Sequence, residues 1–400
     1  MRAVPSLVLA ILAACAPGSS REPDGGGPGD AAEGRDAGPA DGGAVDAGPV
    51  DARATDAGGD AGGGDAGTTD TLRVLTLNLH CLDASGTAYA TNEERLAAVA
   101  DFVAAEDVSV ALLQEVCDGG ALNALETLDS AIEARTGASW GSAFALAHIA
   151  WEGTPEAADE GVAILARGTL TELEETTHVA QGALRRVVIE ATLDASLGGV
   201  RVASFHFDHL DASMRERQAG ELAVMPLVGM GAGPHALLGG DLNDTEGSGA
   251  HAALLAAGFV DASADLPADR IDHLFVHRGA GVTATEAELV LSAPGERVSD
   301  HPGVLVILRR AEPAAVAVTH VVGHADVGFG HYMTIRGDTA PLSWDRGWPL
   351  LNVAADEWRF ATTELTAAFA FKLLRDDDTW QTGADVAGTP GTTHDVTPAF

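Results

Sequence analysis

The chain has 400 residues, which is enough for two or three domains of ordinary size. It holds 59 acidic and 23 basic residues, which gives a net charge of −36. Such acidity argues against general affinity for nucleic acids or anionic membranes, because both require a basic surface. A hydrophobic content of 46% allows most of the chain to bury a core, whereas 48 glycines and 17 prolines indicate that some of it does not.

The first fifteen residues have the features of an export signal. Arg2 precedes an apolar run, Leu7 to Leu12, that is too short to cross a bilayer. The residues that follow, up to Cys15, resemble the lipobox of bacterial lipoproteins. This resemblance implies acylation of Cys15 and a lipid anchor that holds the exported protein on a bacterial membrane, either the outer membrane or the cell surface. The alternative is an ordinary cleaved signal with an incidental cysteine.

Residues 16–70 predict a flexible tether. They include 16 glycines, 12 acidic residues and three arginines, and they contain no Leu, Ile, Met, Phe, Tyr or Trp. Without such side chains nothing in this stretch can pack, and its charges repel one another. We therefore expect folded structure to begin near residue 71.

Polar residues follow the strand-like runs of the next segment. A run over 71–77 ends at Asn78, and a second run over 108–113 leads to Glu115. Between them, residues 91–94 have the pattern of a capping box that opens a helix. A strand, a helix and a strand in succession indicate a crossover unit, which would place Asn78 and Glu115 together at one end of neighbouring strands.

Later runs lead to polar residues in the same way. The alternating run 199–205 precedes His206, and the run 236–240 precedes Asp241. Two glycines at the end of the second run are expected to let the chain turn sharply and expose the aspartate. Residue types that bind metals or move protons therefore gather at strand ends, namely His206, Asp241, Asn243, Asp272, Asp300 and His301.

In this order, the elements resemble the endonuclease/exonuclease/phosphatase superfamily, the deoxyribonuclease I-like enzymes that cut phosphate esters. The matching pieces cover about residues 71–310 and are Leu77-Asn78, Gln114-Glu115, Gly161 to Leu165, the strand ending in His206, Gly240 to Asn243, Ile271-Asp272 and Ser299 to His301. The resemblance implies an α/β fold, a four-layer α/β/β/α sandwich. It also implies a metal-dependent hydrolase of phosphate esters, of the phosphodiesterase or nuclease type.

The resemblance assigns the metal ligands. Glu115 would bind the divalent metal, with Asn78 beside it and Asp300 near. Magnesium suits such a site because it keeps most of its waters and takes few protein carboxylates, and Mn²⁺ or Ca²⁺ are the alternatives.

The resemblance also assigns the catalytic roles. Asp241 and Asn243 would position the attacking water and a phosphate oxygen. His301, held by Asp272, would act as the general base or as an electrostatic partner of the phosphate. His206 would donate to the phosphate or the leaving group. These residue types suit phosphoryl transfer, which depends mostly on charge neutralisation.

Two histidines complicate the assignment. His80 stands where many family nucleases place an acid or a base, so the family's substrate contacts are not carried over at that position. The family histidine that precedes the helical segment could be His209 instead of His206. Strand alternation favours His206, because it shares a face with Val202 and Ser204.

Two other functions compete with this interpretation. The segment from Ser204 to His209 half resembles the HxHxDH metal motif of metallo-β-lactamase-fold hydrolases, but that fold would leave Asn78, Glu115 and Asp241 unexplained. A catalytically inactive, glycan-binding surface lipoprotein is the second alternative. Candidates at every catalytic position argue against it.

The substrate stays open among nucleic acids, sphingomyelin-type lipids, inositol phosphates and other phosphate esters. The acidity argues against duplex DNA, whose binding depends on neutralising phosphates. Arg185-Arg186 and Arg215 with Arg217 hint at a local basic groove, although such spacing is more typical of solvated surface. We expect a monomer.

The remaining cysteines are Cys81 and Cys117. They lie three residues after Asn78 and two after Glu115, so if those residues converge on one metal, as the resemblance implies, their loops run close together. An oxidising compartment would favour a disulfide between them. The alternative is two buried free thiols.

Residues 316–400 predict a small all-β sandwich after a short linker, Glu312 to Ala315. The segment 330–385 resembles starch-binding-type carbohydrate modules, which implies binding of α-glucan or another polysaccharide. Trp344 and Trp380 could stack on sugar faces, with Lys372 beside them, whereas Trp358 is expected in the core. The alternative is that all three tryptophans are buried.

Overall fold

The computed structural model describes residues 71–119, 122–228, 236–311 and 315–400. The expected export signal with Cys15, the tether over 16–70 and most of the linker lie outside the described residues. Within the described part, none of the helices has the length and apolar character needed to cross a membrane.

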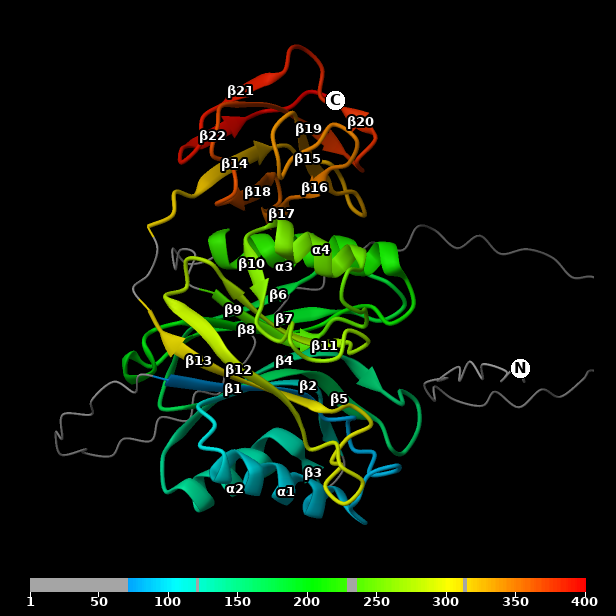
Figure 1. Cartoon of the computed structure of the whole chain (residues 1–400). Helices are drawn as coiled ribbons and strands as arrows, with labels where there is room; N and C mark the ends of the chain where they lie inside the picture. Colours follow the sequence, from blue (N-terminus) through cyan, green and yellow to red (C-terminus); the bar gives the residue numbers. More distant parts are fainter. Residues whose placement is uncertain (1–70, 120–121, 229–235, 312–314) are drawn as a thin grey trace, which may run out of the picture. The chain divides into compact units, whose positions relative to one another are not determined.

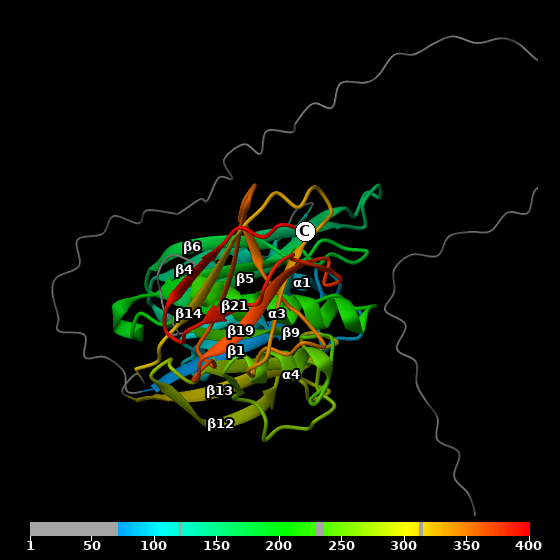
Figure 2. The same ribbon diagram turned by 90° about the horizontal axis from the view of Figure 1, so that it is seen from above.

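Two mixed sheets form the centre of the first domain (Figure 1). One has the order β12-β13-β1-β2-β5-β4 with β3 beside β2, and consists of β1 (Thr71–Asn78), β2 (Val110–Gly119), β3 (Leu122–Asn123), β4 (Trp140–Ala150), β5 (Ala158–Arg167), β12 (Val282–Val290) and β13 (Gly303–Arg310). The other has the order β10-β11-β9-β8-β7-β6, and consists of β6 (Leu170–Thr177), β7 (Val187–Leu193), β8 (Arg201–His206), β9 (Ala236–Asp241), β10 (Phe259–Asp261) and β11 (Asp272–His277). Figure 2 shows β1, β13 and β12 side by side, as their pairing requires.

Helices cover the outer face of each sheet. α1 (Asn92–Ala105) and α2 (Ala124–Thr136) pack on the first sheet, and α3 (Ala212–Val228) and α4 (Gly249–Ala256) pack on the second. A short 3₁₀ turn, η1 (Ala195–Leu197), joins β7 to β8. Apolar side chains of both sheets meet in a core between them. The fold is therefore the expected four-layer α/β/β/α sandwich.

Local sequence explains why α1 begins where it does. The side chain of Thr91 accepts a hydrogen bond from the backbone N–H of Glu94 and so caps the first turn. Leu96, Val99 and Val103 recur at helical spacing, and all are buried against the first sheet. The predicted helix start is confirmed.

The strand order brings the polar strand ends to one edge of the sandwich. β1 and β2 are parallel and align Asn78 with Gln114, the neighbour of Glu115. β8 and β9 are also parallel and align His206 with Asp241, and β9 pairs with β11 so that Asp241 stands opposite Asp272. Parallel pairing across a crossover therefore places residues far apart in sequence at the same end of both sheets.

The C-terminal segment forms two further sheets. They have the orders β17-β18-β14-β22 and β16-β15-β19-β20, with β21 beside β19. Their strands are β14 (Thr319–His324), β15 (Met333–Gly337), β16 (Trp348–Pro349), β17 (Leu351–Ala354), β18 (Glu357–Thr362), β19 (Phe369–Arg375), β20 (Thr379–Trp380), β21 (Val386–Gly388) and β22 (Thr393–Val396). Phe360, Phe371 and Trp358 are buried among them, so Trp358 lies in the core as expected. The segment is the expected all-β domain.

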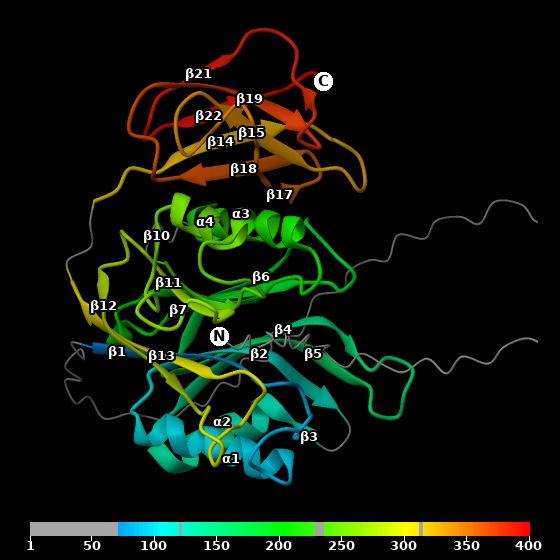
Figure 3. The same ribbon diagram turned by 45° about the vertical axis from the view of Figure 1, so that its right-hand side comes forward.

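The β-domain shares its hydrophobic core with the second layer of helices. Residues 218–227 of α3 are all buried, because one face of the helix packs on the second sheet and another contacts β16, β17 and β18. Figure 3 shows β17 and β18 facing α3 and α4. Arg278 and Glu364 form an ion pair across the same junction. Because this part of α3 is buried on all sides, it lacks the exposed polar face of an amphipathic helix.

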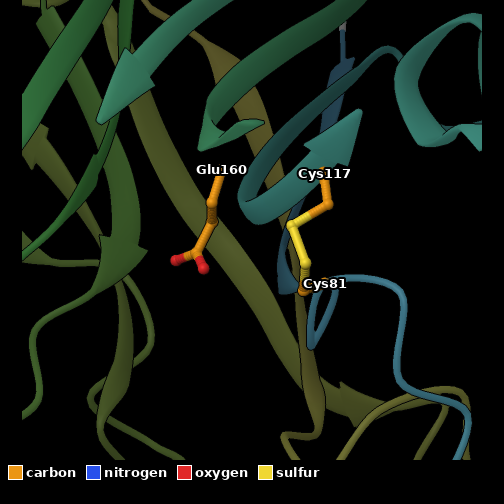
Figure 4. A group of neighbouring side chains, drawn as sticks. All are labelled: Cys81, Cys117 and Glu160. Atoms are coloured by element: carbon orange, nitrogen blue, oxygen red, sulfur yellow. A yellow bond between two sulfur atoms is a disulfide. The ribbon is translucent and has the colours of Figure 1, made fainter. Parts of the chain in front are cut away.

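Cys81 and Cys117 form a disulfide, with their Cα atoms 4.9 Å apart (Figure 4). Cys81 follows the end of β1 and Cys117 lies in β2, so the bridge ties together the chain segments that follow Asn78 and Glu115. The carboxylate of Glu160 lies beside the two sulfurs.

We predict that the denatured, unreduced protein has no free thiol at Cys81 or Cys117. Replacing both cysteines by serine should lower the free energy of unfolding by about 3 to 4 kcal/mol, because the bridge closes a loop of roughly 37 residues. Thiol titration of the mature protein in denaturant and urea unfolding of both forms measure these quantities. Two titratable thiols in the oxidised protein would contradict the prediction.

Candidate active site

Glu115 reaches the site through an irregularity in β2. The register between β2 and β5 shifts between Leu113 and Val116, and Glu115 lies in this β-bulge with a positive φ of 47°. We expected Glu115 just beyond the end of a strand, and this expectation was wrong, since β2 continues to Gly119. A bulge re-aims the extra residue, which explains how a carboxylate within a strand faces the site.

Asp241 ends β9 and is buried, with 1% of its surface exposed. The expected sharp turn at the two preceding glycines was wrong, because both lie within β9. A Cβ atom on Gly240 would lie 2.1 Å from the backbone oxygen of Phe205, and one on Gly239 would lie 2.6 Å from Leu112. Gly240 lets the neighbouring strand β8 approach closely, and Gly239 lets β2 of the other sheet approach closely. Both approaches enclose the aspartate.

Asn78 joins the two carboxylates. Its Nδ2 donates to Glu115 Oε1 at 2.9 Å and to Asp241 Oδ2 at 3.2 Å, while its Oδ1 accepts from the backbone N–H of His80 at 2.9 Å. Burial raises the pKa of Glu115, and the charge of Asp241 adds to this effect. Burial and the charge of Asp272 likewise raise the pKa of Asp241 to about 6.

Asp272 and His301 form a dyad. His301 Nδ1 lies 2.8 Å from Asp272 Oδ2 and 3.9 Å from Asp241 Oδ2. Burial acts to lower the pKa of His301, but the charges of Asp272 and Asp241 outweigh it and raise this pKa to about 11. Because the imidazole carries a proton at neutral pH, this arrangement favours His301 as an electrostatic partner of a phosphate over a base.

His206 is the histidine that reaches the carboxylates. Its Nε2 lies 3.5 Å from Asp241 Oδ2, and its Nδ1 lies 3.2 Å from Nη1 of Arg186. His209 instead contacts Nη2 of Arg186, at 3.4 Å, and is exposed. Burial, followed by the charge of Arg186, holds the pKa of His206 well below its usual value.

The other predicted site residues lie close by. The backbone N–H of Asn243 donates to Asp241 Oδ1 at 2.7 Å, and its side chain donates to the carbonyl of Phe207 at 3.1 Å. Asp300 is 53% exposed and lies 3.7 Å from His80 Nδ1. His80 therefore lies beside Asp300.

The carboxylates of Glu115 and Asp241 fit a hard divalent cation. An oxygen of each lies within 4.8 Å of the other and of a ring nitrogen of His206, but the two nitrogens of His206 contact Arg186 and Asp241, so the carboxylate oxygens are the candidate ligands. The charge of Asp241 helps to raise the pKa of Glu115, and the charge of Asp272 helps to raise the pKa of Asp241, so a cation bound beside these carboxylates would relieve the repulsion. The Nδ2 group of Asn78 donates hydrogen bonds to both carboxylates, so in this arrangement Asn78 orients them. Its role as a direct ligand, like that of Asp300, stays a prediction.

Two buried arginines at the site were not predicted. Arg95 of α1 donates to the carbonyls of Leu79, Cys81 and Val298, and so braces the loops that carry His80 and Asp300. The sequence signal was an arginine on the apolar stripe of a predicted helix, four residues before Val99. Burial lowers the pKa of Arg95 to about 10. Arg186, for which the sequence left open a local basic groove or a solvated surface, is 3% exposed.

The predicted carbohydrate residues lie on the β-domain. The rings of Trp344 and Trp380 have centroids 6.1 Å apart, and 40% of the surface of Trp380 is exposed. Nζ of Lys372 donates to the carbonyls of Gln381 and Gly383, so this lysine holds its own domain together. The two tryptophan rings are therefore neighbours, and both side chains are partly exposed.

Residues 75–301 match the model of the Endonuclease/Exonuclease/phosphatase family, and this range is more than half of the chain. The chain belongs to this family. Its members hydrolyse phosphate esters. The metallo-β-lactamase alternative is therefore wrong, and Ser204, which would begin that motif, instead donates to the carbonyl of Leu113 at 2.9 Å. No curated protein matches the sequence.

Several solved structures are similar to the chain. An endonuclease/exonuclease/phosphatase from Beutenbergia cavernae has a TM-score of 0.51 and 17% identity, over 80% of this chain and 100% of its own. A family protein from Leptotrichia buccalis has a TM-score of 0.48 and 17% identity, over 60% and 99%. A mannosyl-6-phosphatase from Bacteroides thetaiotaomicron has a TM-score of 0.46 and 19% identity, over 59% and 99%. The first match shares the fold and extends past residue 310, since residues 1–310 are less than 80% of the chain.

We predict that Asp272→Asn and His301→Ala each lower kcat for a phosphodiester by about 10²-fold to 10⁴-fold. The double variant should lose little more than His301→Ala alone, because Asp272 acts by holding and charging His301. Steady-state kinetics of the four proteins measure the coupling, and thermal unfolding verifies that each variant is folded. Independent, multiplicative losses would show that the two residues do not form one unit.

Proposed function

We propose that the protein is an exported, lipid-anchored phosphoesterase that depends on magnesium and acts on phosphodiesters. The observation that carries the proposal is the convergence of Glu115, Asp241 and the Asp272–His301 dyad at one edge of the two sheets. Oxygen ligands for a hard cation and protonatable groups beside them are what phosphoryl transfer requires.

Each side chain has a distinct task in this proposal. Asp241, whose pKa is raised to about 6, accepts the proton of the attacking water, and Asn243 orients that water. The positive charge of His301 stabilises the negative charge of the phosphate. His206 stays neutral and donates from Nε2 to a phosphate oxygen or to the leaving group. Magnesium held by Glu115 would neutralise the charge that develops on the phosphate.

The charge of the folded part, and not the geometry of the site, ranks the substrate classes. A sphingomyelinase-like or inositol-phosphate phosphatase activity would use the same core residues, so the catalytic groups do not distinguish them. Residues 71–400 carry 47 acidic and 19 basic residues, which disfavours long polyanions such as duplex DNA. We therefore rank small phosphodiesters above nucleic acids.

A panel of nucleic acid, phospholipid and sugar-phosphate substrates with magnesium tests the proposal. Wild-type protein should hydrolyse at least one member, and chelation should abolish the activity until magnesium is restored. Glu115→Gln and Asp241→Ala should each lower turnover by several orders of magnitude, because they remove the anionic ligand and the proton acceptor.

Glu286→Gln on β12 is the matched control, since Glu286 is exposed and distant from the site in the sheet order. This variant should keep wild-type turnover. Turnover by Glu115→Gln at saturating magnesium equal to that of the control would refute the metal assignment. Activity that survives chelation and is restored only by zinc would point to a different class of hydrolase.

We propose carbohydrate binding as a second function, carried by the β-domain. Trp344 and Trp380 lie at an interplanar angle of 39°, and the guanidinium carbon of Arg336 lies 5.3 Å from the Trp380 ring. Two tilted, partly exposed rings suit the apolar faces of adjacent sugar units in a polysaccharide such as α-glucan. Arg336 is itself held by Asp377 at 2.7 Å, which keeps the platform rigid.

We predict that Trp344→Ala loses retention on insoluble α-glucan while its Tm stays within about 1 °C of wild type, a shift of less than about 1 kcal/mol for a chain of this size. Trp358→Ala is the control, because Trp358 is buried and its loss should lower Tm markedly without a direct effect on sugar contact. Sedimentation with the polysaccharide and thermal unfolding measure both effects. A large fall in Tm for Trp344→Ala would favour a structural role.

A further inference from the structure

A cavity of about 310 Å³ lies between helix α3 and the β-domain. The two are in contact beside it, because β16 packs on α3 (Figure 1). Both domains contribute charged or polar side chains to its walls, among them Ser213, Glu216, Arg217, Tyr332, Arg346 and Asp377. Its volume is that of a site for a small molecule or for one unit of a larger one. We call it the junction cavity.

Contacts between the walls fix the shape of the junction cavity. Glu216 of α3 forms an ion pair with Arg346 of the β-domain. Asp377 accepts hydrogen bonds from Oγ1 of Thr334 at 2.9 Å and from the backbone N–H of Gly347 at 3.3 Å. The walls are therefore held in place before a ligand arrives, which lowers the entropic cost of binding.

Arg217 brings an unused hydrogen-bond donor to the junction cavity. Its guanidinium carbon lies 3.8 Å from the centroid of the Tyr332 ring. Its Nε is buried and has no hydrogen-bond partner in the part of the chain that the structure describes. A buried donor without a partner is costly, and a ligand that supplies an acceptor would remove that cost.

The charges of the lining indicate the class of ligand. The carboxylates of Glu216 and Asp377 equal in number the guanidiniums of Arg217 and Arg346. Without a net charge, the junction cavity lacks the field that would concentrate an ionic ligand. Sugar hydroxyls both donate and accept, so they match a lining that offers carboxylates, guanidiniums and hydroxyls together. The ring of Tyr332 adds an aromatic surface, and the chemistry therefore favours an uncharged saccharide.

The junction cavity adjoins the pair formed by Trp344 and Trp380. Asp377 of its lining pairs with Arg336 at 2.7 Å. Arg336 in turn donates to the carbonyl of Trp344 at 3.0 Å and lies 5.3 Å from the Trp380 ring. Only three residues separate Trp344 from Gly347 of the lining, so their Cα atoms are at most roughly 11 Å apart. An oligosaccharide of several units can therefore contact both places.

We propose that the junction cavity is a second saccharide subsite, which holds sugar units next to those stacked on Trp344 and Trp380. Arg217 would donate to a sugar oxygen, and Tyr332 would contact the sugar from the β-domain. The inference rests on the proposed carbohydrate binding and goes beyond it, because it assigns part of the binding site to a helix of the phosphoesterase domain. A bound polysaccharide would thus be held against that domain as well as by the β-domain.

A neighbouring cavity gives the ligand room to continue. Its volume is about 210 Å³, and it shares Glu216 and Arg346 with the junction cavity. Small or apolar side chains such as Ala252, Ala256 and Trp348 form much of its lining. The two cavities together follow the side of α3 and α4 that the β-domain faces.

Maltoheptaose, a soluble fragment of α-glucan, is the probe, and calorimetry with the full-length protein measures its Kd. Arg217→Met should raise the Kd about tenfold, because it removes a charged donor and keeps an apolar stem. Ser213→Trp should raise the Kd by a similar factor, because the larger side chain takes up space in the cavity. Ser213 is exposed, so this variant should fold as the wild type does.

Arg359→Met is the matched control. Arg359 of β18 is a partly exposed arginine of the β-domain that pairs with Glu357 at 2.6 Å and does not line the junction cavity. This variant should bind maltoheptaose as the wild type does. A wild-type Kd in both Arg217→Met and Ser213→Trp would overturn the inference, as would a wild-type protein that does not bind maltoheptaose. If thermal unfolding shows that Arg217→Met is destabilised, Ser213→Trp decides alone.

The outcome is separable from that of the proposed carbohydrate binding. Retention on insoluble α-glucan that depends on Trp344, with maltoheptaose binding unchanged in both cavity variants, would support the tryptophan pair and refute the junction subsite. Maltoheptaose binding that both cavity variants weaken and Trp344→Ala does not would support the junction subsite and refute the role of the tryptophan pair.

Discussion

Crowding of negative charge in a buried place is the constraint around which the site is built. Glu115, Asp241 and Asp272 converge where little water can screen them, and repulsion between them raises the pKa of the first two. The surrounding groups each reduce this cost. Asn78 donates to Glu115 and Asp241. His301 brings a positive charge close to Asp241 and Asp272. A site held together in this way is ready to receive a cation.

The backbone is distorted at the same place. Four residues at the site have φ between 45° and 51°, a backbone conformation that residues other than glycine seldom adopt. They are His80, Cys81, Glu115 and Asn243. Such residues cost roughly 1 to 3 kcal/mol each, so the structure around them must compensate. Arg95 and the disulfide supply part of this compensation, because both fasten the loop that follows β1. Contacts outside the site therefore offset the free-energy cost of the strained backbone within it.

The features of the site that could be predicted from the sequence are those that a local sequence pattern specifies. Asn78, Asp241 and His301 adjoin strands and lie in short motifs, so their convergence followed from the order of the elements. The bulge at Glu115 and the close approach of the other sheet at Gly239 depend on partner strands, which no local pattern specifies. The burial of Arg186 was not predicted for a similar reason. It results from the approach of β4, β5 and β8, and the residues beside Arg186 in the sequence give no signal of it.

The boundary between the two domains is clear in the sequence but not in the packing. Helix α3 is covered by sheet on one side and by β-domain strands on the other, and one core includes residues of both. A chain ending near residue 311 would leave the outer face of this helix, with residues such as Ala223 and Val224, open to water. The catalytic layers and the appended domain should accordingly melt as one cooperative unit, and a shortened version would be prone to aggregate.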